Sequence, residues 1–226
     1  MGFWVDDIVP WGRSFDEYVA MFDLTEVDLA GRILGCGDGP AAFNVGLTAR
    51  GGKAVSVDPV YAVSPDALRK RIESGFDTVL AQVRRQQDAY IWDAVPSLEA
   101  LRDLRMSSMQ AFLEDYVAGR AEGRYLAAEL PELPMEADSF DLALSSHFLF
   151  LYADRLSADF HVAALREMLR VAREVRVFPL VTLEGELSPA LGEATERLAE
   201  DGFTLQVRRV PYEFQRGACE MLRIVR

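Results

Sequence analysis

The order of apolar and polar stretches near the start of the chain predicts a strand, a turn, a helix and a second strand. An apolar run at 32–34 leads into the glycine-rich turn GCGDG at 35–39, and residues 41–50 are rich in alanine and other apolar residues. Two glycines then stop the helix, and the apolar run at 53–57 ends at Asp58. This order is that of a parallel β-α-β unit, so we expect a doubly wound α/β sheet.

The rest of the chain continues the alternation of strands and helices. From their apolar runs, further strands are predicted at 125–128, 140–145, 175–181, 203–210 and 219–225. A short loop joins the last two, which is typical of an antiparallel pair. The sheet is therefore expected to be mostly parallel and to end with an antiparallel strand.

Capping residues mark where several helices begin. Ser14, with Glu17 three residues later, has the pattern of a capping box and predicts a short opening helix. Ser157 precedes a stripe of apolar residues at helical spacing, and Ser188 opens a helix that ends at Gly202.

Residues 61–123 are too long for a single crossover between neighbouring strands. One predicted helix begins near Ser64 and a second covers 98–118, with a break at Pro96 between them. We expect a helical insertion, or lid, beside the mouth of the sheet. Residues 1–226 are then expected to form a single domain, since domains usually contain ~50–250 residues.

The chain carries 36 acidic and 24 basic residues, which give a net charge of −12. Binding to nucleic acid or to an anionic membrane surface depends on cationic patches, so neither partner is expected. No uncharged run approaches the ~18 residues of a membrane span, and the first residues do not resemble a secretory signal. We therefore expect a cytoplasmic protein, whose oligomeric state the sequence leaves open.

Metal and disulfide sites are not expected. Cys36 and Cys219 lie far apart and form no CxxC pair. The two histidines, His147 and His161, are too few for the common histidine-based zinc motifs.

The glycine turn is the strongest chemical signal, because glycines let backbone N–H groups approach a ligand closely. Asp58 follows Gly37 by 21 residues, at a strand end where a carboxylate can accept two hydrogen bonds from a ribose diol. The pattern Gly37-x-Gly39-x-x-Ala42 also satisfies the permissive dinucleotide fingerprint. This half of the chain therefore does not separate NAD from another adenosine ligand.

Together, the segments ILGCGDGPAAF, VSVDP and AAELPELPMEADSFDLALSSHFLFLY resemble the class I S-adenosylmethionine-dependent methyltransferases, especially those that act on small molecules. The resemblance spans most of residues 30–226, with 61–123 as an insertion. It implies a Rossmann-like fold with an antiparallel last strand and S-adenosylmethionine as the cofactor. It further implies direct displacement, in which a small-molecule acceptor takes the methyl group.

The resemblance also assigns cofactor-binding residues in the first half of the chain. It implies that the glycine turn lines the methionyl and ribose part of the cofactor, through Gly35, Cys36, Gly37 and Gly39. Asp58 would accept hydrogen bonds from the ribose hydroxyls, and Pro59 would pack against the adenine.

In the second half, Glu129 falls where the family often places an acid against the adenine amino group, and the Leu130 backbone N–H would meet the ring. Ser145 and Ser146 lie where the end of the fourth strand contacts the methionyl amine.

Three features depart from the family pattern. Ile33 stands where an acid often lies two residues before the first glycine, and Ala128-Glu129 replaces the usual Gly-Asp pair. The usual Gly-Gly turn before the fifth predicted strand is also absent.

His147 follows the predicted strand 140–145 and is the candidate general base at the mouth of the sheet, with a non-catalytic histidine as the alternative. His161 lies in phase with the apolar stripe of its helix and is expected to be structural. Two other functions stay open, an NAD(P)-dependent reductase and a non-catalytic S-adenosylmethionine-binding protein. The chain has no Tyr-x-x-x-Lys pair for the reductase, and the acceptor atom is not specified.

Overall fold

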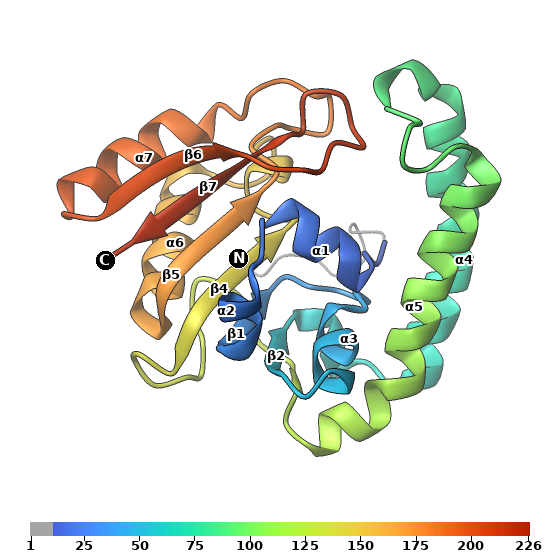
Figure 1. Ribbon diagram of the computed structural model, residues 1–226, viewed down its shortest axis with the longest axis horizontal. Coiled ribbons are helices and arrows are strands. Elements are labelled where there is room, and N and C mark those ends of the chain that lie inside the picture. Colours follow the sequence, from blue (N-terminus) through green and yellow to red (C-terminus); the bar gives the residue numbers. More distant parts are fainter. Residues whose placement is uncertain (1–10) are drawn as a thin grey trace.

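The computed structural model describes residues 11–226, which form a seven-stranded β-sheet flanked by helices (Figure 1). The strand order is β3-β2-β1-β4-β5-β7-β6. The strands are β1 (Arg32–Cys36), β2 (Lys53–Val57), β3 (Tyr125–Leu126), β4 (Phe140–Ser146), β5 (Ala172–Phe178), β6 (Thr204–Arg209) and β7 (Glu220–Val225). The expected doubly wound α/β sheet is confirmed.

Strands β1 to β5 run parallel, and β7 pairs antiparallel with both β5 and β6. The antiparallel ending predicted from the last two apolar runs is therefore confirmed. β3 is shorter than the predicted strand 125–128. Its partner β2 ends at Val57, and the chain then turns at Asp58 into a 3₁₀ helix, so no partner backbone remains beyond Leu126.

Helices cover both faces of the sheet. They are α1 (Phe15–Met21), α2 (Glu26–Ala30), α3 (Phe43–Ala49), α4 (Pro65–Arg85), α5 (Leu98–Ala121), α6 (Ala158–Val171) and α7 (Ala190–Glu200), with 3₁₀ helices η1 (Pro59–Ala62), η2 (Gln87–Ala89) and η3 (Phe150–Tyr152). Tyr18 of α1 and Phe43 of α3 pack with Leu142 and Leu144 of β4. On the other face, Leu165 of α6 packs with the strand residues whose side chains point to that face.

The capping box predicted at the start of the chain is confirmed. The Ser14 hydroxyl accepts a hydrogen bond from the Glu17 N–H, and the Glu17 carboxylate accepts one from the Ser14 N–H. A second box, formed by Thr25 and Asp28, opens α2 after Asp23 adopts a φ of 47°. The opening helix is therefore short, as expected, and the turn after it contains another helical segment.

The strand predicted at 175–181 begins and ends three residues earlier, at 172–178. Helix α6 passes directly into β5, because Ala172 is already extended while its N–H still donates to the Met168 carbonyl. The strand ends at Phe178 because Pro179 has no N–H to donate to the sheet. The absence of a glycine turn thus reflects the absence of any connecting loop.

The segment 61–123 is helical, as expected. Its helices α4 and α5 lie side by side along one side of the molecule (Figure 1). Tyr61, Phe112, Tyr116 and Tyr125 form an aromatic cluster that packs α5 against η1 and β3. The lid function of this segment stays a prediction.

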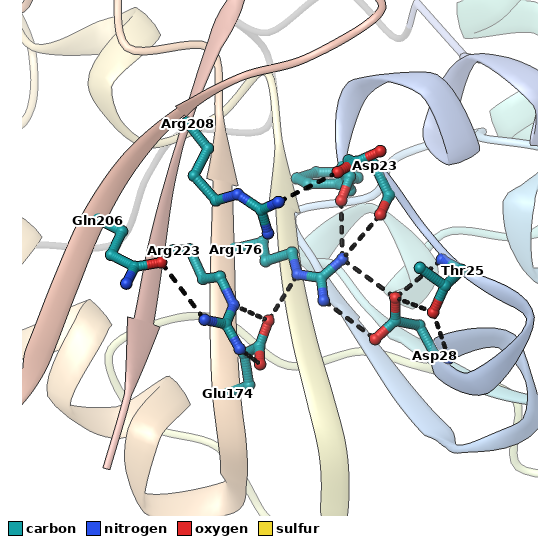
Figure 2. Close-up of polar contacts among 9 residues, drawn as sticks. Asp23, Thr25, Asp28, Glu174, Arg176, Gln206, Arg208 and Arg223 are labelled. Carbon is teal, nitrogen blue, oxygen red and sulfur yellow. Dashed lines mark hydrogen bonds and ion pairs between the residues drawn. The ribbon is translucent and has the colours of Figure 1, made fainter.

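A network of charged residues ties the α1–α2 segment to the sheet (Figure 2). Arg176 of β5 is only 5 % exposed, and its guanidinium donates to Glu174 at 2.7 Å, to Asp28 at 3.0 Å and to the Phe22 carbonyl at 2.8 Å. Arg223 of β7 donates to the same Glu174 at 2.6 Å. Two carboxylates therefore balance the buried charge of Arg176, which would otherwise be costly.

Candidate functional site

A cavity of about 1000 Å³ lies at the carboxyl ends of the central parallel strands. The turn 37–39 after β1, the turn 58–60 after β2 and residues 146–148 at the end of β4 all line it. Strand β1 has β2 as its neighbour on one side and β4 on the other, so the strand order reverses at β1. Doubly wound sheets bind ligands at such a reversal.

A second part of the cavity wall comes from elements outside the central strands. Helix α4 contributes a strip at helical spacing, and the segment before α1 and the loop between β6 and β7 contribute aromatic side chains. These residues are Val79, Gln82, Val83, Gln86, Trp11 and Phe214. This part of the wall is largely uncharged.

Gly37 and Gly39 both line the cavity, and the lack of a side chain matters for a different reason at each. Gly37 has a φ of 70°, and a Cβ there would lie 2.9 Å from the Phe148 ring. Gly39 has a φ of 52°, and the nearest atom to a Cβ there is Asp58 Oδ2, at 4.0 Å. Gly37 therefore permits a close internal contact, whereas Gly39 leaves open space that a ligand can enter.

Asp58 lies on the cavity wall directly after β2. Its Oδ2 accepts a hydrogen bond from the Gly39 N–H at 2.8 Å, and its Oδ1 accepts one from the Val60 N–H at 2.8 Å. Burial raises the pKa of this carboxyl, and the two backbone N–H groups partly oppose the rise. The carboxylate is thus fixed beside the glycine turn, and each oxygen keeps a lone pair for a further donor.

Asp38 is a cavity residue that the sequence analysis did not single out. It is 8 % exposed, and its carboxylate accepts hydrogen bonds from the Tyr18 hydroxyl at 2.9 Å and the Ser56 hydroxyl at 2.6 Å. Burial raises its pKa to about 6, and the Asp58 charge adds to the rise. The sequence feature that could have identified Asp38 is its position as an acidic residue inside the glycine turn.

His147 lines the cavity next to Ser146, and its Nδ1 lies 2.9 Å from the Ser146 hydroxyl. Its backbone has a φ of 54°, and its N–H donates to the Phe178 carbonyl at 2.7 Å. Burial holds the pKa of the imidazole well below its usual value, and the charges of Arg13 and Arg105 lower it further. The ring is therefore neutral at pH 7.

The remaining predicted binding residues divide into two groups. Pro59, Glu129 and Leu130 line the cavity together with the residues described above. Gly35, Cys36 and Ser145 do not line it. Cys36 is packed in the apolar core, and a Cβ at Gly35 would overlap the Asp38 carboxylate. These two residues therefore pack against the residues that line the cavity.

Arg13 places a guanidinium on the cavity wall. Its Nη1 donates to the Trp11 carbonyl at 2.8 Å, whereas its Nε is buried and has no hydrogen-bond partner among residues 11–226. Burial lowers the pKa of Arg13, and the Arg105 charge lowers it further. The sequence offered no signal for this residue beyond its place before the first helix.

A buried ion pair joins three segments behind Arg13. Arg105 of α5 is fully buried and donates to both oxygens of Glu17 in α1, at 2.5 and 2.7 Å. The Tyr212 hydroxyl, from the loop between β6 and β7, donates to Glu17 at 2.9 Å. Burial alone would raise the pKa of Glu17, but the Arg105 guanidinium outweighs it and lowers the pKa to about 2.

His161 lies outside the cavity lining. It is fully buried in α6, stacks on Phe150 with ring centroids 5.2 Å apart, and has its Nδ1 2.8 Å from the Ser157 carbonyl oxygen. The expected structural placement is confirmed. Residues 11–226 contain no helix long and apolar enough to span a membrane, nor any group of three or more metal-ligating side chains.

The strand order and the antiparallel β7 give the sheet the Rossmann-like form that the sequence resemblance implies. No protein-family model matches the sequence. An uncharacterized protein of Methanocaldococcus jannaschii, MJ0045, is 29% identical over 221 residues, which cover 97% of each chain.

Solved structures with the methyltransferase fold are distant in sequence. Magnesium protoporphyrin IX methyltransferase from Synechocystis PCC 6803, with bound S-adenosylmethionine, matches with a TM-score of 0.49 and 14% identity, covering 94% of this chain and 77% of its own. A putative RNA methyltransferase from Pyrococcus horikoshii, PH1948, matches with a TM-score of 0.42 and 11% identity, covering 87% of this chain and 76% of its own.

Proposed function

We propose that the protein is an S-adenosylmethionine-dependent methyltransferase that acts on a small-molecule acceptor. The observation that carries the proposal is the placement of Asp58 beside Gly39 on the wall of a large cavity at the ends of the parallel strands. The resemblance of the glycine turn and of the segment around Phe140 to class I methyltransferases supports it. The net charge of −12 favours a small acceptor over nucleic acid.

The wall residues fit the parts of the cofactor. Each Asp58 oxygen can still accept one hydroxyl, as a ribose diol requires. Pro59 and Leu130 offer apolar surface for an adenine, and Glu129 offers an acceptor for its amino group. The Nε of Arg13, buried without an acceptor, suits the carboxylate of the amino-acid end.

The size of the cavity supports a two-ligand site. Its volume of about 1000 Å³ is at the upper end of small-molecule sites, which span ~300–1,000 Å³. The strand-end residues can hold the cofactor, while the strip on α4 and the loop between β6 and β7 can hold an acceptor. This division assigns the uncharged wall to acceptor binding.

When bound, S-adenosylmethionine supplies an electrophilic methyl group on its sulfonium. The protein's contribution is to hold the acceptor in line behind that methyl, since orientation alone can account for much of a rate enhancement. His147, neutral at pH 7, would take the proton of an acceptor that still holds one. Its contact with Ser146 fixes the ring at the cavity wall.

The proposal is tested by calorimetry with S-adenosylhomocysteine, the demethylated cofactor. Micromolar binding is expected, and Asp58→Ala should weaken it about 10-fold or more, because charge-assisted hydrogen bonds contribute ~1.5–3 kcal/mol. Asp77→Ala, at an exposed acid on α4, is the matched control and should bind like the unmodified protein. Absence of binding at millimolar ligand, or full affinity in Asp58→Ala, would refute the proposal.

The two alternatives make different predictions. A nicotinamide-dependent reductase of the dinucleotide-binding fold ends its sheet with a parallel strand, and β7 is antiparallel. A non-catalytic binding protein would bind S-adenosylhomocysteine and yet transfer no labelled methyl group to a deproteinised metabolite extract. Transfer to a compound in that extract therefore separates an enzyme from a binding protein.

A further inference from the structure

Asp38 is a buried carboxylate on the cavity wall that the proposed function has not used. It lies in the glycine turn between β1 and α3 and is 8 % exposed. Among residues 11–226, the groups that act on its pKa are Ser56, Tyr18 and Asp58, and none of them is a cation. A buried carboxylate without a cation is costly, and such groups mark functional sites.

The surroundings of Asp38 are built to hold its carboxylate in place. Tyr18 from α1 and Ser56 from β2 each donate a hydroxyl hydrogen bond to one of its oxygens. Gly35 lacks the Cβ that would overlap this carboxylate. A carboxylate oxygen accepts more than one hydrogen bond, so both oxygens can take another donor.

A second observation identifies the direction from which a ligand reaches it. Tyr18, whose hydroxyl donates to Asp38, lines the same cavity as Ser146, whose hydroxyl lies 2.9 Å from His147 Nδ1. Asp38, Tyr18, Ser146 and His147 all line the cavity. Asp38 therefore belongs to the wall between the glycine turn and the end of β4, and no cation in the described part of the chain acts on its pKa.

We propose that Asp38 is the counter-ion for the ammonium group at the amino-acid end of the bound ligand, and that binding of this ammonium displaces a proton from the site. The inference rests on the proposed function, since S-adenosylmethionine and S-adenosylhomocysteine both carry such a group. The carboxylate of the same amino-acid end would meet Arg13, so the two charged residues would hold the two charges of a zwitterion.

The titratable groups around Asp38 come from every element packed against it. They are Tyr18 of α1, Cys36 of β1, Asp58 after β2, Tyr61 of η1 and Tyr125 of β3. Burial raises the pKa of each tyrosine and of the cysteine, so these groups stay uncharged at neutral pH. Asp58, whose pKa burial also raises, is the other acid that the experiment must control.

The direction of the pH effect follows from the pKa of Asp38, which burial raises to about 6. An ammonium binds the ionised carboxylate, so affinity should rise with pH and level off above pH 6. One pKa unit corresponds to a tenfold change in the ionisation equilibrium, so affinity at pH 5 should be roughly 10-fold below that at pH 7. At pH 6, about half a proton should be released per ligand bound.

The experiment compares two probes by calorimetry between pH 5 and pH 8, in two buffers with different ionisation enthalpies. S-adenosylhomocysteine carries the ammonium, whereas 5′-methylthioadenosine has the same nucleoside and no amino-acid end. The first should release the proton and lose affinity at pH 5. The affinity for 5′-methylthioadenosine reports the contribution of Asp58 alone and should depend less on pH.

Variants assign the effect to Asp38. Asp38→Asn should lower the affinity for S-adenosylhomocysteine about 10-fold or more at pH 7.5 and remove the additional proton release, with the affinity for 5′-methylthioadenosine changed by less than about threefold. Asp58→Asn, the comparison variant, should weaken both probes. Tyr18→Phe, which removes one hydrogen bond to the ionised carboxylate, should move the midpoint of the pH dependence upward.

Three outcomes would overturn the inference: equal proton release with both probes, full S-adenosylhomocysteine affinity in a folded Asp38→Asn, or an unmoved midpoint in Tyr18→Phe. The Tyr18 variant keeps the carboxylate, so the inference stays falsifiable even where Asp38→Asn fails to fold. Failure of the proposed function looks different, because neither probe would then bind the unmodified protein.

Discussion

His147 combines a functional side chain with an unusual backbone conformation. Its φ of 54° is in the left-handed region, which asparagine adopts more readily than most residues. His147→Asn should therefore keep this backbone conformation while removing the neutral imidazole. If the acceptor holds a proton, turnover should fall ~10²- to 10⁴-fold, the usual contribution of a general base. The measurement is the rate of labelled methyl transfer to the acceptor fraction of the metabolite extract.

His161→Asn is the matched control, because His161 is buried in α6 outside the cavity lining. It should lower stability and leave turnover per folded molecule unchanged. Turnover in His147→Asn equal to that of the unmodified protein would assign His147 to the wall without a role in proton transfer.

The residues of the site that sequence could predict are those defined by local pattern. A glycine turn after an apolar run and an acid at the end of the next run locate Gly37, Gly39 and Asp58 within one β-α-β unit. Asp38 and Arg13 depend on partners brought together by the fold. Asp38 is held by Tyr18 and Ser56, each 18 or more residues away, and no spacing rule connects them.

At the scale of elements, one buried ion pair connects α1 with α5. Arg105→Met leaves the Glu17 carboxylate buried without its cation and should cost ~3–5 kcal/mol of unfolding free energy. Replacing Glu17 by Leu in the same chain should recover much of this loss, because an apolar pair requires no desolvation of charge. Urea unfolding of the single and double variants gives the coupling between the two residues.

Arg197→Met is the control for this prediction. Arg197 of α7 pairs with Asp159 at 2.7 Å, but the Asp159 side chain is 85% exposed. Exposed pairs contribute ~0–1 kcal/mol, so little stability should be lost. A similar small loss in Arg105→Met would show that α5 does not depend on the buried pair for its position.

Helices were predictable where capping residues mark their starts, as at Ser14, Ser64 and Ser157. Strand limits were less predictable, since they depend on the partner strand. β3 stops where β2 stops, and β5 begins at Ala172 without any turn residue. The docking of the helical segment 61–123 rests on contacts such as Arg105 with Glu17, 88 residues apart, which no local pattern contains.

At the scale of the molecule, the cavity wall draws on segments from Trp11 near the start of the chain to Ala218 near its end. A ligand that binds there stabilises the whole fold. At 100 times its dissociation constant, S-adenosylhomocysteine should add ~2.7 kcal/mol. For a chain of this length each kcal/mol raises Tm by ~2–4 °C, so a rise of roughly 5–10 °C is expected.

Scanning calorimetry at pH 7.5 measures this rise, with NADH at the same excess as the control ligand. A larger rise with NADH would contradict the assignment of the cofactor. No rise with S-adenosylhomocysteine at 100 times its measured dissociation constant would show that the ligand binds the unfolded chain equally well.

The reversed direction of β7 has a consequence for how such a protein diversifies. Because β7 is antiparallel to β5, its first residue, Glu220, lies near the carboxyl end of β5. The loop from β6 to β7 therefore lies at the same end of the sheet as the glycine turn. That connection brings Tyr212 and Phe214 to the cavity. If the final strand were parallel, it would begin at the opposite end of the sheet. Inverting one strand thus gives the sheet a recognition loop that can change its length and side chains to suit a new acceptor, while the strand ends that hold the nucleoside stay as they are.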